Sequence, residues 1–126
     1  MSYSEIALGA ARQAIAEAEA LLNAGFARGT AARSYYAMFY AATALLAKEG
    51  KDFIKHRALL AAFGMELVQT GKVPAKYHRM LIDAFELRLD ADYDLEAQVD
   101  LEHAHQVCEE ARDFVAMAAD RLSERV

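Results

Sequence analysis

Residues 32–42 read Ala32-Arg33-Ser34-Tyr35-Tyr36-Ala37-Met38-Phe39-Tyr40-Ala41-Ala42, and they are the part of the chain that decides the expected fold. At about 100° per residue, a helix through them carries one non-polar stripe at the spacing of a buried face. The stripe consists of Tyr35, Met38, Phe39, Ala42, Leu45 and Leu46. The opposite face carries Arg33, Tyr36, Ala37, Tyr40 and Ala44 instead of the charges of a solvated helix. We therefore expect this second face to contact a partner helix, a second copy of the chain or a nucleotide.

Length and composition predict one helical domain over residues 1–126. The chain is 56% hydrophobic, which excludes a disordered protein, and it contains one proline and no tryptophan. Abundant alanine and few β-branched residues favour helix throughout. The expected fold class is all-α, an up-and-down bundle of four long helices plus one short helix.

Caps and glycines give the expected helix limits. The first helix is expected over about 3–24, with Ser2 and Glu5 as a capping box. After a turn over 25–29, Thr30 is the candidate N-cap of a second helix that runs to about Glu49. The short helix is expected over 56–69. Pro74 is expected in the first turn of the next helix, residues 90–100 mostly in a loop, and Asp100 as the cap of the last helix.

Charge and cysteine content limit the function classes. The formal net charge of −5 argues against a broad nucleic-acid surface but allows a local basic site. The lone Cys108 gives no disulfide framework, the first residues show no signal peptide, and no apolar run is long enough to span a bilayer. We expect a cytoplasmic protein without membrane association. We also expect no cofactor and no metal, because Glu102-x-x-His105 is only half of a bundle metal motif.

The eleven residues quoted above resemble the core motif of the HEPN domain, the higher eukaryote and prokaryote nucleotide-binding domain. The resemblance continues in Lys55-His56-Arg57 and in Arg88-Leu89-Asp90-Ala91-Asp92-Tyr93, so it covers most of the chain. It is closest to small stand-alone prokaryotic HEPN proteins that are often encoded beside a minimal nucleotidyltransferase. The resemblance implies the HEPN half of a nucleotidyltransferase–HEPN toxin–antitoxin-like pair, and we expect this chain to form a homodimer.

The same resemblance places a catalytic motif at Arg33 and Tyr40. In HEPN ribonucleases the equivalent arginine is followed at this spacing by a histidine, and the pair is thought to act without a metal across a dimer interface. Here Tyr40 replaces the histidine. A phenol with a pKa of about 10 is a poor general base at neutral pH, although it can hydrogen-bond a phosphate or stack on a base. Binding is therefore favoured over catalysis, and a metal-independent endoribonuclease toxin is the alternative.

The other candidate residues are expected around this pair. Tyr36 and Tyr40 share a face with Arg33, where they form either a nucleotide clamp or the seam of a homodimer. Arg88 either pairs with Asp92 or joins Arg33 in an anion pocket.

Two flanking segments carry further candidates. Lys55 and His56 are either a solvated loop or a second phosphate contact, and Tyr93 is expected to be a hydrogen-bonding cap over the bundle end. The predicted nucleotide- or phosphate-binding set is Arg33, Tyr36, Tyr40, Lys55, His56 and Arg88.

Overall fold

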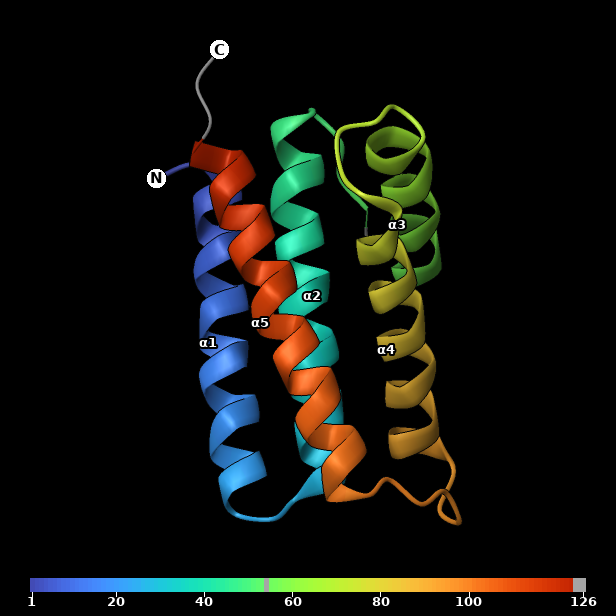
Figure 1. The fold of residues 1–126 in the computed structure, drawn as a ribbon. Helices are drawn as coiled ribbons and strands as arrows, with labels where there is room; N and C mark the ends of the chain where they lie inside the picture. The colour runs from blue at the N-terminus through green and yellow to red at the C-terminus, as the bar shows by residue number, and fades with distance from the viewer. Residues whose placement is uncertain (54, 124–126) are drawn as a thin grey trace.

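The computed structural model describes residues 1–53 and 55–123 as a bundle of helices without a strand (Figure 1). The long helices are α1 (Tyr3–Asn23), α2 (Ala27–Lys48), α4 (Ala75–Tyr93) and α5 (Leu101–Ser123), and the short one is α3 (His56–Ala62). This confirms the predicted class of four long helices and one short helix. No helix in the described part of the chain combines the length and the apolar character that a bilayer crossing requires.

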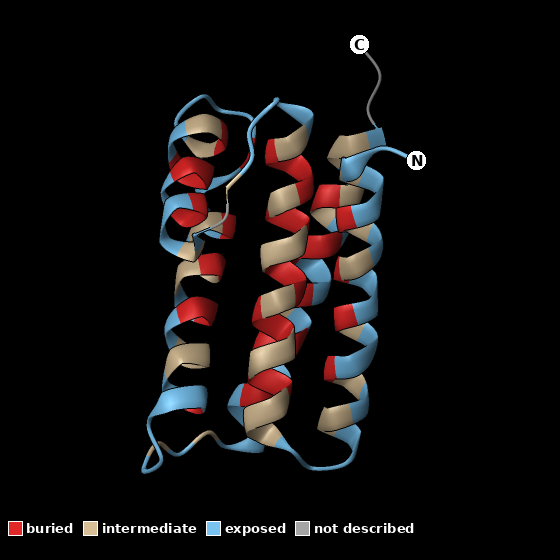
Figure 2. Cartoon of the chain, turned by 180° about the vertical axis from the view of Figure 1, so that it is seen from behind, coloured by how far each residue is buried: buried red, intermediate tan, exposed pale blue. Residues whose placement is uncertain are grey.

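Helix α2 occupies the centre of the bundle and packs against α1, α4 and α5. No residue of α2 before Lys48 is exposed, and the buried residues drawn in red follow this helix along its length (Figure 2). Tyr35 and Met38, on the predicted core stripe, are fully buried. Ala37 and Ala44, on the opposite face, are fully buried as well. Neighbouring helices of the same chain therefore cover these alanines, which agrees with the partner-helix alternative. The expectation that the alanines meet a second copy or a nucleotide is wrong.

Two of the predicted helix caps are confirmed and one is wrong. The hydroxyl of Ser2 accepts a hydrogen bond from the Glu5 amide at 3.1 Å, and the carboxylate of Asp100 accepts one from the His103 amide at 2.7 Å. Thr30 is not a cap, because α2 already begins at Ala27. The turn before α2 is made at Gly25, whose φ of +85° is readily adopted by glycine. The hydroxyl of Thr30 donates a hydrogen bond to the Phe26 carbonyl at 2.8 Å.

Helix α4 is longer than predicted, and it continues through residues that we expected in a loop. It ends at Tyr93, and Pro74 lies one residue before it instead of inside its first turn. Pairing between Arg88 and Asp92 and burial of Ala91 stabilise the last turn despite its acidic sequence. The true loop spans 94–100. Arg28 holds it by donating hydrogen bonds to the carbonyls of residues 97 and 94, at 2.6 and 2.7 Å.

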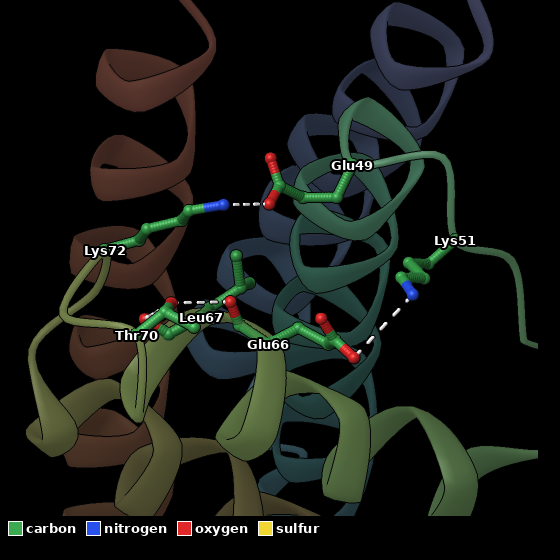
Figure 3. A network of polar contacts seen from close by, with 6 residues as sticks. All are labelled: Glu49, Lys51, Glu66, Leu67, Thr70 and Lys72. Atoms are coloured by element: carbon green, nitrogen blue, oxygen red, sulfur yellow. Dashed lines mark hydrogen bonds and ion pairs between the residues drawn. The ribbon is translucent and has the colours of Figure 1, made fainter.

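The short helix continues as a π-helix, Phe63–Val68, instead of an α-helix up to Gln69. Gly64 lies in this segment against the ring of His78, whose Nε2 is 2.9 Å from the Leu60 carbonyl. Salt bridges then tie the segment and the turn after it to the end of α2 (Figure 3). The pairs are Lys72 with Glu49 and, at 3.7 Å, Lys51 with Glu66.

The packing of Gly64 gives a stability prediction with an internal control. A Cβ at Gly64 would lie 2.6 Å from Cε1 of His78, a ring held by its hydrogen bond and by stacking on Phe63. Gly64→Ala should therefore lower the free energy of unfolding by about 1–3 kcal/mol. At exposed Gly9, a Cβ would meet nothing within 4 Å, so Gly9→Ala should raise it by about 0.5–1 kcal/mol. Urea unfolding of both variants measures the difference, and equal effects would contradict this packing.

Candidate functional site

The predicted site residues of α2 meet a fourth residue, Arg88, around the ring of Tyr36. The guanidinium carbons of Arg33 and Arg88 lie 5.0 and 5.2 Å from the centre of this ring. The Tyr40 ring lies 5.9 Å from it, one turn further along the helix. Arg88 also donates a hydrogen bond from Nη2 to the Tyr36 hydroxyl at 2.7 Å. Arg33 and Arg88 thus both border the Tyr36 ring, and their joint anion pocket, one of the two alternatives drawn from the sequence for Arg88, stays a prediction.

Both arginines have a carboxylate partner. Nε of Arg33 lies 3.1 Å from Oε1 of Glu17 on α1, and Nε of Arg88 lies 2.9 Å from Oδ2 of Asp92. The second pair is the ion pair predicted from the spacing of the two residues. The Arg88 side chain is 13% exposed and that of Arg33 is 34% exposed. The local charge of the site is therefore largely neutralised.

The two ion pairs differ from well-aligned hydrogen bonds at Nε. The Nε atoms of Arg33 and Arg88 are both buried, and neither has an acceptor in hydrogen-bond alignment among the described residues. The short distances to the carboxylates therefore represent electrostatic pairing without an aligned Nε–H bond. Buried donors of this kind almost always have an acceptor in folded proteins. The carboxylates of Glu17 and Asp92 have this role for the two Nε atoms.

His56 reaches the same cluster through a buried hydrogen bond. Its Nδ1 lies 2.6 Å from the hydroxyl of Tyr35, which is fully buried, and its ring stacks on Phe39 at 4.3 Å. Burial, and secondly the positive charge of Arg88, lower the pKa of His56 below its usual value. Burial raises the pKa of Tyr35 well above the usual value of a phenol. At neutral pH this pair is therefore an uncharged phenol and an uncharged imidazole.

Two candidate residues do not fit their predicted places. Lys55 is exposed, and its side chain forms no ion pair or hydrogen bond with the described residues, so the fold does not bring it into the cluster. Tyr93 is 73% exposed and is not a hydrogen-bonding cap, since its hydroxyl has no partner in the part of the chain that is described. Its ring lies 5.9 Å from the guanidinium carbon of Arg88, at the edge of the cluster.

An apolar groove of about 240 Å³ begins beside Tyr40. Its lining comes from α1, α2 and the segment before α3, and consists of Tyr3, Ile6, Ala7, Ala10, Phe39, Tyr40, Thr43 and Phe53. Beside the groove, the arginine cluster offers guanidinium donors and the rings of Tyr36 and Tyr40. Such a combination suits a phosphate with an attached base. Among the described residues, no group of three His, Cys, Asp or Glu side chains is placed to hold a metal ion.

Sequence reasoning missed Glu17 and the bond between Tyr35 and His56. Glu17 lies on the exposed side of α1, and only the packing of α1 on α2 brings it to Arg33. Tyr35 was correctly predicted to be a core residue, but nothing local shows that its hydroxyl would meet a side chain 21 residues away. In both cases the missing information is the rotation of one helix relative to another.

Comparison with known proteins identifies the family. A family model described as HEPN domain matches residues 4–122. A UPF0332 protein of Thermotoga maritima is 40% identical over 66% of this chain, and the match spans 63% of that relative's length. A protein of Methanocaldococcus jannaschii named "Putative toxin" is 31% identical over 90% of this chain and 84% of its own length. A second protein of that organism, with the same designation, is 28% identical over 83% of this chain and 71% of its own length.

The different burial of the two arginines predicts different effects on stability. Arg88→Met should lower the free energy of unfolding by about 1–3 kcal/mol, because Tyr36 loses its donor in a partly buried place. Arg33→Met removes a more exposed ion pair and should lower the free energy of unfolding by less than about 1 kcal/mol. Thermal and urea unfolding of the two variants provide the comparison. A cost at Arg33 as large as that at Arg88 would show that its pair with Glu17 is structural.

Proposed function

This chain belongs to the HEPN domain family, and from that membership we propose that it binds the phosphate of a nucleotide or of single-stranded RNA between Arg33 and Arg88. The observation that carries the proposal is the convergence of two guanidiniums on the Tyr36 ring, 5.0 and 5.2 Å from its centre, with the Arg33 side chain 34% exposed. A phosphate has several acceptor oxygens, and the planar fork of a guanidinium suits them. Tyr36 and Tyr40 are placed to stack on the attached base.

We propose further that the protein is a HEPN toxin-like component of a toxin–antitoxin-like pair, with a small nucleotidyltransferase as partner. Two relatives from Methanocaldococcus jannaschii carry the name "Putative toxin". Their names support the toxin-like part of this proposal. The nucleotidyltransferase is proposed as partner because the chain resembles small HEPN proteins that are encoded beside nucleotidyltransferases. Co-purification with the product of an adjacent gene tests it, and a chain recovered without a nucleotidyltransferase from its native cell would contradict it.

Binding is a better match to this site than cleavage. The residue at the position of the motif histidine is Tyr40, whose neighbours Tyr36 and Phe39 are aromatic, and no carboxylate or histidine hydrogen-bonds to it among the described residues. A neutral phenol does not remove a proton from a ribose hydroxyl at pH 7. The endoribonuclease alternative therefore has no general base at its expected place.

A homodimer remains part of the proposal, although on a different surface. The alanines of α2 that suggested it are buried inside the chain. The groove beside Tyr40 is instead bordered by Tyr3 and Ile6, which are 56% and 53% exposed, and it offers apolar surface that a second copy would cover.

The phosphate site predicts weak, salt-dependent binding of the dinucleotide ApA, with a dissociation constant of about 1 mM or somewhat below. Raising the salt from about 50 to about 200 mM should weaken binding about threefold, as expected for one neutralised phosphate. Glu17→Gln should tighten binding several-fold, because it removes the carboxylate that competes for Arg33. Arg33→Ala should weaken it about tenfold. Calorimetric titration measures these constants, and ApA should be recovered intact.

The matched control is Arg79→Ala. Arg79 is an exposed arginine of the same helix as Arg88, but it lies about 180° around α4 from it. This variant changes the net charge as Arg33→Ala does and should leave the affinity within about twofold. Equal losses of ApA affinity in both variants would show that the change in net charge, and not the loss of Arg33 itself, weakens binding. Steady cleavage of ApA would instead restore the endoribonuclease alternative.

The dimer proposal predicts sedimentation at twice the chain mass of 13.9 kDa at micromolar concentration. Ile6→Lys should give a monomer, because it places a charge on the rim of the apolar groove. Leu95→Lys is the control, since Leu95 is 92% exposed in the loop before α5 and does not line the groove. A wild-type chain that sediments as a monomer, or a dimer that both variants leave intact, would contradict this surface.

A further inference from the structure

His56 is the one histidine in contact with the arginine cluster, and its ring has a fixed environment on three sides. Phe39 stacks on it at 4.3 Å, Phe85 of α4 lies 6.2 Å from its ring centre, and Tyr36 lies 6.0 Å away on edge. Its Nδ1 faces the buried Tyr35 hydroxyl. The hydrogen bond of this ring to a described residue is the one at Nδ1, and its other nitrogen, Nε2, has no such partner among them. The histidine is half-buried, so Nε2 is the part that remains for a ligand.

The direction of the hydrogen bond between Tyr35 and His56 follows from burial. Tyr35 is fully buried, and Nδ1 of His56 is the only acceptor near its hydroxyl among the described residues. A buried hydroxyl proton without an acceptor is costly, so the phenol donates and Nδ1 accepts. In a neutral imidazole the proton then sits on Nε2. The buried phenol thereby selects one tautomer of His56.

We propose, building on the phosphate site above, that Tyr35 holds His56 as an uncharged donor whose Nε2–H binds the same phosphodiester as Arg33 and Arg88. In this arrangement His56 does not carry protons. An Nε2 that already bears hydrogen has no lone pair with which to act as a base. It could act as an acid only if Tyr35 gave its own proton to Nδ1, which would leave a phenolate in the core.

The surrounding charges favour the same state. From α4, the guanidinium of Arg88 opposes a second positive charge on the imidazole, and burial acts in the same direction, so the pKa of His56 is lowered. From α2, Tyr35 and Tyr36 contribute only neutral hydroxyls. From its own segment, the neighbouring cations Lys55 and Arg57 are exposed to solvent. Protonation would also turn Nδ1 into a donor and leave the Tyr35 proton without an acceptor.

The first test reads the tautomer in the free protein by nitrogen-15 NMR of the imidazole. Nδ1 of His56 should show the shift of an unprotonated nitrogen and Nε2 that of a protonated one, unchanged from pH 8 to pH 6. The opposite tautomer, or titration of His56 within this range, would overturn the proposal. Because no ligand is involved, this measurement stands even if the phosphate site itself is wrong.

The second test follows ApA binding by calorimetry. Its phosphodiester does not titrate near neutral pH, so the wild-type affinity should be flat between pH 8 and pH 6. His56→Leu should weaken binding about tenfold, and His56→Gln, which keeps an N–H donor at a similar reach, should stay within about threefold of wild type. Tyr35→Phe frees Nδ1 to accept a proton, so its affinity should rise as pH falls, since the histidine then gains charge.

The outcomes separate the two proposals. If the wild-type protein binds no ApA, both the proposed phosphate site and the proposed donor role of His56 are wrong. If ApA binding depends on Arg33 but the His56→Leu variant binds ApA as tightly as wild type, only the proposed donor role of His56 is wrong. If the affinity of the wild-type protein for ApA rises steeply below pH 7, the imidazole of His56 is charged. This result would also overturn the proposed role of His56 as an uncharged donor. Thermal unfolding of each variant verifies that the measured chains are folded, and His56→Gln provides the comparison least disruptive to packing.

Discussion

The enclosure of one helix on nearly every side is the constraint on which the rest of this structure depends. Helix α2 buries most of its alanines together with Tyr35 and Met38. Arg33, Tyr36, Phe39 and Tyr40 are only half covered. Small side chains permit the close approach of α1 and α5 that fills the core. Because α2 cannot rotate without exposing part of that core, the direction of Tyr36 and Tyr40 is determined by packing.

Much of the architecture was readable from local patterns. The core stripe of α2, the caps at Ser2 and Asp100 and the pairing of Arg88 with Asp92 all follow from spacing along one helix. Local patterns failed where two signals competed. Acidic residues after Arg88 suggested a loop, yet an ion pair and a buried alanine extend α4 to Tyr93. Thr30 has the chemistry of a cap, but Gly25 completes the turn earlier.

The candidate site was predictable in part. Arg33, Tyr36 and Tyr40 share a face because they share a helix, and the sequence shows this directly. The same pattern misassigned Ala37 and Ala44, because a helical wheel gives the direction of a side chain but not what lies opposite. Glu17, His56 and Arg88 come from three other elements, and their arrival depends on helix rotations that no single-helix pattern encodes.

The hydrogen bond from Arg88 to Tyr36 joins residues 52 positions apart, and it has a consequence for the life of the chain before folding is complete. During synthesis the first two helices can pair while α4 is still unmade, but the cluster around Tyr36 then contains a single arginine. Only when residue 88 has left the ribosome and α4 has docked are both guanidiniums present. Nascent chains and proteolytic fragments that end before α4 thus lack the complete site, whatever helix they contain.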